Sequence, residues 1–313
     1  MEKDNFVNLH LHTDYSQGDA TIKIPELFYE VQKNNQKAVA ITDHGNIVGW
    51  SQFFLLGQDT NVKPIFGCEF YCTPSTDKPQ DNNRYHLVVL AKDDEGAKNL
   101  SKLEYLSTAK YFYRRPLLPY PILFDNPEGL FISTACSLGT IGQCFNPDNK
   151  NHFPHEAEPF LNKLLDVFGK ENVAAEFQFH PAYPPQKTIN SKLLDLYSDI
   201  DMKYCVATTD AHFISDRNTR RHLQADMFHK QKNDVTPSLP SNCLGTSKLV
   251  KQFAEQSGFE DLPLVDTMIK NTSIIADKCN VTSINNIGKK RVLPTFTKHQ
   301  QLKKIFLKEP RRR

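Results

Sequence analysis

Seven short apolar runs alternate with longer amphipathic segments along most of this chain. The short runs are rich in β-branched and aromatic residues, which favours strands. They cover residues 6–10, 38–42, 63–71, 85–91, 129–134, 172–178 and 204–209. The longer segments have helical periodicity and cover residues 25–36, 49–59, 93–112, 155–168, 187–200 and 216–230. This alternation predicts an α/β fold with a parallel sheet, either open or closed into a barrel of about seven strands.

Helix-start residues support these boundaries. Pro25 suits a first helical turn, because its fixed φ matches the helix and its missing N–H costs nothing there. Asp93 and Asp216 suit N-caps, since a carboxylate can accept hydrogen bonds from free backbone N–H groups. Two further helices are predicted at 249–256 and 263–278.

The charge distribution divides the chain into a body and a tail. The 313 residues, 39% of them hydrophobic, allow one large domain or two small ones. Residues 289–313 carry ten basic residues and one acidic residue, which leaves 28 basic and 35 acidic residues in the rest. We therefore expect a mildly acidic domain over 1–285 and a basic tail over 286–313. The tail either binds phosphate backbones or is a solvated chain end.

The sequence predicts neither a membrane span nor a secretory signal. No apolar stretch is long enough to cross a bilayer, and the first ten residues have no apolar segment of a secretory signal. The seven cysteines form no obvious disulfide framework, which is typical of reduced thiols. We expect a cytoplasmic protein that does not associate with membranes.

Potential metal ligands recur where the predicted strands end. His10 and His12 are two residues apart on a strand, so both imidazoles can reach one metal ion. Such a pair is weak evidence alone, but other ligand types follow at the ends of later strands or beside them. They are Asp19, His44, Glu69, His86, Cys136, Asp210 and His212. In α/β folds the carboxyl ends of the strands form the site, and packing does not explain this recurrence.

Several neighbouring residues allow a structural interpretation as well. Asp43 is a turn or capping residue, to which we assign a supporting role, and Cys136 taken alone is more typical of an inert core thiol. His180 follows the run 172–178 and is either a substrate contact or a structural residue. Glu176 and Gln178 share one face of that run, where they can line the pocket.

The ligand set predicts metal-assisted phosphoester chemistry. A mixed cluster of imidazoles and carboxylates of this size can hold two to three divalent metal ions, and Zn, Mn or Fe all fit. Paired metals produce hydroxide from water near neutral pH and stabilise the attacking and leaving oxygens of a phosphoryl transfer. The chain has neither a GxSxG elbow nor a GxxxxGK[ST] loop, which argues against serine hydrolases and P-loop nucleotide hydrolases.

Six sequence motifs together resemble the PHP (polymerase and histidinol phosphatase) superfamily. They are HLHTDYS, TDHG, GCEF, YHLVVLA, STACSLG and ATTDAHF, and the likeness extends over about residues 5–285. The chain is most similar to the N-terminal PHP domain of bacterial DNA polymerase III alpha subunits. The resemblance implies a distorted (β/α)7 barrel with a trinuclear metal site at the C-terminal edge of the strands.

The resemblance also implies which residues share each metal. His10, His12, Glu69 and Asp210 would hold the first ion and form the catalytic group. Glu69, His86 and Cys136 would hold the second, and Asp19, His44 and His212 the third. All nine positions carry a competent ligand type in this sequence.

The implied activity is that of a metal-dependent 3′–5′ exonuclease using a metal-bound hydroxide. DNA, either single-stranded or as a primer 3′ end, would be the substrate, and replication proteins are possible partners. Arg84, Arg114, Arg115 and His180 are the candidate substrate contacts, and the segment 110–115 mixes aromatic rings with cations. A helix end packed by its aromatic residues explains the same segment equally well.

Two other functions use the same sequence features. One is a small-molecule phosphomonoesterase of the histidinol-phosphatase type, and the other is a non-catalytic scaffold related to the polymerase PHP domain. Residues 291–306 resemble the linker that leads to the polymerase palm. We therefore expect either a stand-alone PHP protein or part of a longer chain, and no polymerase activity from these residues.

Overall fold

A computed structural model describes residues 4–76, 84–150, 154–200, 202–215 and 239–284. The predicted helix at 216–230, with its Asp216 cap, and the basic tail at 286–313 lie outside these residues. Among the described helices, none is both long and apolar enough to cross a bilayer. All seven cysteines are buried, and none of them forms a disulfide bond.

The centre of the molecule is a sheet curled into a half-barrel. Its strands follow the order β1-β2-β3-β5-β6-β7, and the short strand β4 pairs with β2 away from this path. The bounds are β1 (Ala38–Ile41), β2 (Lys63–Thr73), β3 (Tyr85–Ala91), β4 (Leu118–Pro119), β5 (Leu130–Ser133), β6 (Val173–Gln178) and β7 (Tyr204–Thr208). The predicted α/β class is confirmed, and six of the seven predicted strands are present.

The expectation of an all-parallel sheet was wrong at β3. This strand runs antiparallel to both β2 and β5, whereas β1–β2, β5–β6 and β6–β7 are parallel. The connection from β2 to β3 spans only residues 74–84, which is shorter than the dozen or more residues that a parallel crossover usually needs. The start of β3 therefore lies at the sheet edge where the parallel strands end.

The predicted first strand at 6–10 is not a regular strand, although this segment takes its place beside the sheet. The Ala40 N–H donates to the Asn8 carbonyl at 2.9 Å, and the Ala211 N–H donates to the His10 carbonyl at 3.2 Å. The segment thus runs between β1 and the chain that follows β7. It lacks a regular ladder because side chains satisfy two of its N–H groups: Phe6 donates to Asp4 Oδ1 and Val7 to Thr272 Oγ1.

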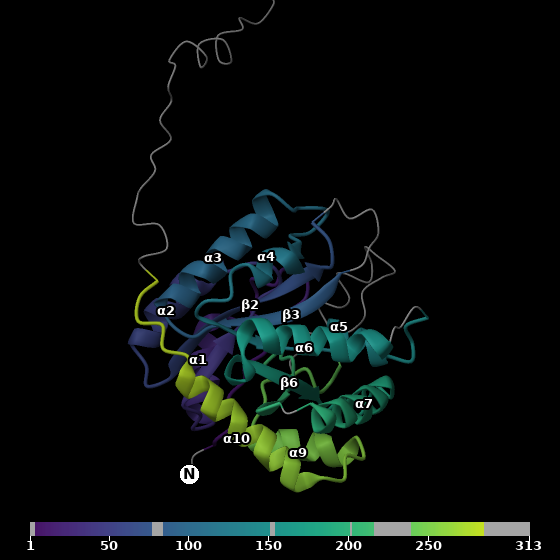
Figure 1. Cartoon of the computed structure of the whole chain (residues 1–313). Coiled ribbons are helices and arrows are strands. Elements are labelled where there is room, and N and C mark those ends of the chain that lie inside the picture. Colours follow the sequence, from purple (N-terminus) through teal and green to yellow (C-terminus); the bar gives the residue numbers. More distant parts are fainter. Residues whose placement is uncertain (1–3, 77–83, 151–153, 201, 216–238, 285–313) are drawn as a thin grey trace, which may run out of the picture.

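Helices cover the outside of the curled sheet, and α9 and α10 pack together at one end (Figure 1). Asp93 caps α3 as predicted, because its side chain accepts a hydrogen bond from the Gly96 N–H at 2.8 Å. The helices that correspond to predicted ones are α1 (Ile24–Lys33), α2 (Trp50–Gln58), α3 (Asp94–Ala109), α6 (Ala157–Phe168), α7 (Pro185–Asp199), α9 (Ser247–Gln256) and α10 (Leu262–Lys278). Those without a prediction are α4 (Tyr120–Phe124), α5 (Thr140–Phe145) and the 3-10 turns Pro154–Glu156 and Lys170–Asn172.

The inner face of the sheet is apolar at one end and polar at the other. Side chains two apart on a strand share a face. On β2, Ile65 belongs to the inner apolar cluster, and Glu69 lies on the same face four residues later. On β3, Val88 belongs to that cluster, and His86 lies on the same face two residues earlier. Ile275 of α10 packs against the apolar end. The polar side chains consequently meet at the other end of the inner face, next to this apolar cluster.

Candidate metal centre

The Glu69 carboxylate lies at the centre of the polar end. Its Oε1 is 3.1 Å from His10 Nε2 and 3.0 Å from His86 Nδ1. Its Oε2 is 2.7 Å from His44 Nδ1 and 3.5 Å from His12 Nε2. Glu69 itself is 1% exposed, so the carboxylate meets these four rings away from solvent. Such an arrangement allows one carboxylate to bridge two cations.

A second carboxylate completes a ligand set around the first histidine pair. Asp210 Oδ1 is 3.1 Å from His10 Nε2 and 3.2 Å from His12 Nε2, and the two Nε2 atoms are 3.2 Å apart. Both rings are fully buried. Two imidazole nitrogens and two carboxylates therefore point to one place, as the resemblance implied for the first metal.

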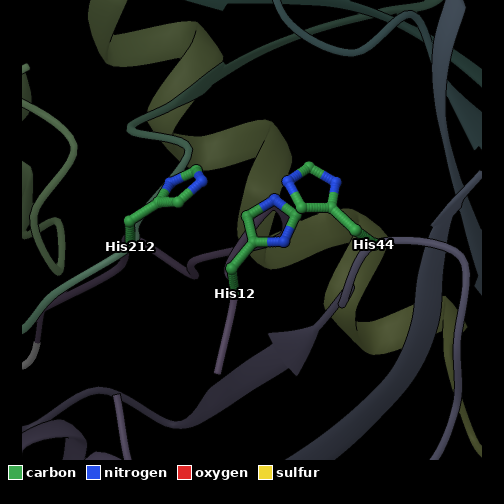
Figure 2. A group of neighbouring side chains, drawn as sticks. All are labelled: His12, His44 and His212. Atoms are coloured by element: carbon green, nitrogen blue, oxygen red, sulfur yellow. The ribbon is translucent and has the colours of Figure 1, made fainter. Parts of the chain in front are cut away.

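The opposite side of the cluster contains His44, His212 and Asp19. Asp19 Oδ2 is 2.8 Å from His44 Nε2 and 3.4 Å from His212 Nε2. Figure 2 shows the rings of His44 and His212 beside that of His12, whose ring centroid is 4.1 Å from the former and 4.5 Å from the latter. His12 thus lies between two groups of ligands.

Cys136 lies at the edge of the cluster, directly after β5. Its Sγ is 3.5 Å from His86 Nδ1 and 3.9 Å from Glu69 Oε1. The structure therefore brings all nine predicted ligand positions into one cluster. The grouping differs from the implied sets in two respects. His44 faces Glu69 and His86 as well as Asp19, and His12 also lies close to His44 and His212.

The polar atoms that face each other here fit a bound cation. His44 Nδ1, Glu69 Oε2 and Asp210 Oδ1 are buried and make no hydrogen bond of acceptable geometry. Buried polar atoms are nearly always hydrogen-bonded. These three nitrogen and oxygen atoms lie close together without a hydrogen bond, so they need another partner, such as a cation. Imidazole nitrogens, carboxylate oxygens and one thiol are the ligand types of Zn, Mn and Fe sites.

Electrostatic interactions keep the carboxylates ionised. Burial raises the pKa of Glu69 and of Asp210, but the neighbouring histidines outweigh this effect and lower both pKa values. Burial, followed by the charges of His44 and His212, lowers the pKa of His12 to about 3. Burial also lowers the pKa of His212, but Asp210 and Asp19 outweigh it and raise that pKa to about 9. His12 is thus neutral and able to bind a metal, whereas His212 would release a proton on binding one.

Comparisons with known proteins agree with this geometry. The family model described as "PHP domain" matches residues 8–180, more than half of the chain. The chain belongs to the PHP domain family. It is 36% identical to DNA polymerase III subunit alpha of Aquifex aeolicus over 234 residues, which are 71% of this chain and 19% of that protein.

A second relative extends the match along nearly the whole PHP chain. DNA polymerase III subunit alpha of Borreliella burgdorferi is 29% identical over 94% of this chain and 25% of its own length. The PHP chain thus spans a quarter or less of these two relatives. A solved structure from Bifidobacterium adolescentis aligns with 82% of this chain and 98% of its own, at TM-score 0.42 and 13% identity.

Glu176 orients a metal-ligand candidate of the PHP domain. His10 Nδ1 donates to Glu176 Oε1 at 2.6 Å, which leaves His10 Nε2 free to face Glu69. The same carboxylate accepts hydrogen bonds from Ser133, Thr208 and Gln178. The sequence predicted that Glu176 and Gln178 line the pocket, but only Gln178 does, and Glu176 is buried against His10 instead. Strand alternation gives the face of a side chain and not its partner.

We expect Glu176→Gln to weaken metal binding about 10- to 100-fold. The amide has the shape of the carboxylate, but its NH2 group faces hydrogen-bond donors and cannot hold His10 in the same way. Calorimetric titration of the metal-free protein with Mn²⁺ measures the effect. Glu104→Gln on α3 is the matched control, since the Glu104 carboxylate accepts a hydrogen bond from the Thr108 hydroxyl on the same helix. Equal affinities in the two variants would contradict this role.

Asp43 has the supporting role that its position indicated. Its carboxylate accepts hydrogen bonds from the N–H and hydroxyl of Thr13 and from the Ser16 hydroxyl. Because Ser16 donates to Asp43, its oxygen is left to accept from His12 Nδ1 at 3.1 Å. This contact directs His12 Nε2 towards the cluster.

The candidate substrate residues lie in different positions. Arg114, Arg115 and His180 line a pocket of about 1010 Å³ above the cluster. Arg84 does not line it and instead donates to the Tyr113 carbonyl at 3.3 Å, next to Arg114. His180 is buried, and burial lowers its pKa to about 4. Both of its ring nitrogens meet protein partners, Ser241 Oγ at 2.6 Å and Gln178 Oε1 at 3.0 Å.

Proposed function

We propose that this PHP domain is a metal-dependent phosphoesterase that shortens DNA from the 3′ end. The observation that carries the proposal is the buried Glu69 carboxylate with four imidazoles around it, two of which, His44 and His86, line the large pocket. Two to three divalent ions of Zn, Mn or Fe fit the ligand types. The known polymerase III alpha relatives favour DNA over other phosphoesters.

The distances indicate which of the nine ligand candidates would hold the same ion. His10, His12, Glu69 and Asp210 would hold one ion, and Glu69, His86 and Cys136 would hold a second. The complete set of ligand residues is His10, His12, Asp19, His44, Glu69, His86, Cys136, Asp210 and His212. When bound, divalent ions lower the pKa of water and stabilise the attacking and leaving oxygens of phosphoryl transfer.

The pocket wall supplies groups that suit a nucleic-acid end. Arg114 has φ +62, a left-handed conformation that a non-glycine residue adopts only when its surroundings hold it. Arg115 donates to the Tyr71 hydroxyl and its guanidinium lies 5.0 Å from the centre of that ring. Phe112 and Tyr113 are exposed beside these cations. Arginines for phosphates next to aromatic rings for bases are typical of single-strand binding.

A direct assay tests this function. The metal-free protein is incubated with a 5′-labelled single-stranded oligonucleotide and Mn²⁺ or Zn²⁺, in parallel with a small phosphomonoester. Stepwise shortening that requires the metal is the expected result. Hydrolysis of the monoester alone would replace the proposal by a small-molecule phosphatase. Hydrolysis of neither, with metals bound, would favour a scaffold.

We expect Arg114→Ala to raise the KM for DNA about tenfold or more while kcat changes less. A hydrogen bond to a charged group contributes about 1.5–3 kcal/mol, and each 1.4 kcal/mol is a factor of ten in affinity. Steady-state kinetics on a labelled oligonucleotide measure both constants. Lys98→Ala is the control, because Lys98 is exposed on α3 and pairs with Glu95 away from the pocket. An unchanged KM would remove Arg114 from the substrate contacts.

A further inference from the structure

Asp210 has an unusual backbone conformation for a metal-ligand candidate. Its φ is +48, in the left-handed region, which residues with a Cβ adopt only rarely. Such a conformation persists only where the surrounding structure fixes it. The Asp210 carbonyl also accepts a hydrogen bond from His212 Nδ1 at 2.7 Å, which leaves His212 Nε2 to face Asp19. The two ligand candidates therefore depend on one short backbone segment.

The Asn242 side chain holds this segment in place. Its Nδ2 donates to the Thr209 carbonyl at 3.1 Å and to the Asp210 carbonyl at 3.0 Å. Its backbone carbonyl accepts from the His212 N–H at 2.8 Å. Asn242 is only 6% exposed, so water does not compete freely for these carbonyls. One residue thus bonds the backbone on both sides of Asp210.

Asn242 is in turn fixed by its own neighbours. Its Oδ1 accepts from the Leu239 N–H at 2.8 Å, so both ends of the amide are engaged. Beyond it, the Leu244 N–H donates to the Phe213 carbonyl at 2.9 Å, and Gly245 exchanges hydrogen bonds with the Asn8 side chain. Asn8 belongs to the segment that carries His10. The chain from Leu239 to Gly245 therefore joins the two segments that supply four of the ligand candidates.

We propose that Asn242 is a positioning residue of the metal centre, which sets the direction of Asp210 and His212 without binding the metal itself. The inference rests on the proposed function for its metal site and does not depend on the substrate. A side-chain amide is required because two carbonyls need two N–H donors. A carboxylate of the same shape has none and would face both carbonyls with negative charge.

Binding of Co²⁺ to the full chain tests the proposal without any substrate. The ligand geometry of this ion determines its visible absorption. Asn242→Asp is expected to weaken Co²⁺ binding about 10- to 100-fold and to change the absorption bands, as loss of other orienting partners does. Asn242→Ser keeps one donor and leaves room for water, so a smaller effect of the same kind is expected if Asn242→Asp does not fold. Asn99→Asp is the matched control, since Asn99 donates to the Glu128 carbonyl away from the pocket.

The outcomes separate this inference from the proposed function. Wild-type Co²⁺ affinity and absorption in the folded Asn242 variants would overturn it, even if their melting temperature falls, because that result indicates a purely structural residue. A wild-type chain that hydrolyses no phosphoester, combined with altered Co²⁺ binding in the variants, would overturn the exonuclease and support the role of Asn242.

Discussion

Asp210→Asn is expected to reduce phosphoester hydrolysis by this PHP domain roughly a thousandfold. Asp210 Oδ1 lies about equally far from His10 Nε2 and His12 Nε2, at 3.1 and 3.2 Å. The substitution therefore removes a negative charge from the middle of the ligand set of one ion. A bound metal ion supplies several kcal/mol of transition-state stabilisation, and each 1.36 kcal/mol is a factor of ten in rate. His12→Ala is expected to have an effect of the same size.

The comparison requires folded variants and a matched substitution. Rates are measured on a labelled oligonucleotide with saturating Mn²⁺, and circular dichroism verifies the fold. Asp195→Asn on α7 is the control, because Asp195 pairs with Lys192 on the surface. If Asp210→Asn and His12→Ala retain wild-type rates, the cluster is not the catalytic centre.

Removal of metal is expected to lower the melting temperature of the chain by roughly 5 to 10 °C. Ions that bind only the folded state at about 100 times their Kd stabilise it by about 2.7 kcal/mol. For a domain of this size each kcal/mol corresponds to about 2–4 °C. The physical reason is the buried cluster itself, in which the ionised Glu69 and Asp210 lie among closely spaced rings.

The measurement is thermal unfolding of chelator-treated protein before and after Mn²⁺ is restored. The double variant His12→Ala, Asp210→Asn serves as the control, since it lacks two ligands of one ion and should respond much less. Identical melting temperatures for the wild-type chain with and without metal would contradict a filled multi-metal site.

Local sequence signals predict most of the regular elements. Apolar runs and helical periodicity predict six strands and most of the long helices, because burial of one face gives each element its own period. Asp93 is also recognisable as a helix cap from local sequence, because its side chain bonds the backbone N–H only three residues further on. The segment 6–10 departed from prediction because Thr272, far along the chain, takes a backbone N–H that a strand would use. Strand β3 departed because the connection over residues 74–84 is too short for a parallel crossover, so β3 pairs antiparallel with β2.

The candidate site shows the same division between local and distant information. The ligand types can be read from the amino-acid sequence, because imidazoles, carboxylates and a thiol follow predicted strands. The three-dimensional packing is needed to show that Glu69 lies at the centre, that Glu176 orients His10 and that Asn242 holds Asp210. Each of these contacts joins residues that are 32 or more positions apart. Such contacts depend on how the curled sheet brings its strand ends together, and no local pattern in the chain encodes that arrangement.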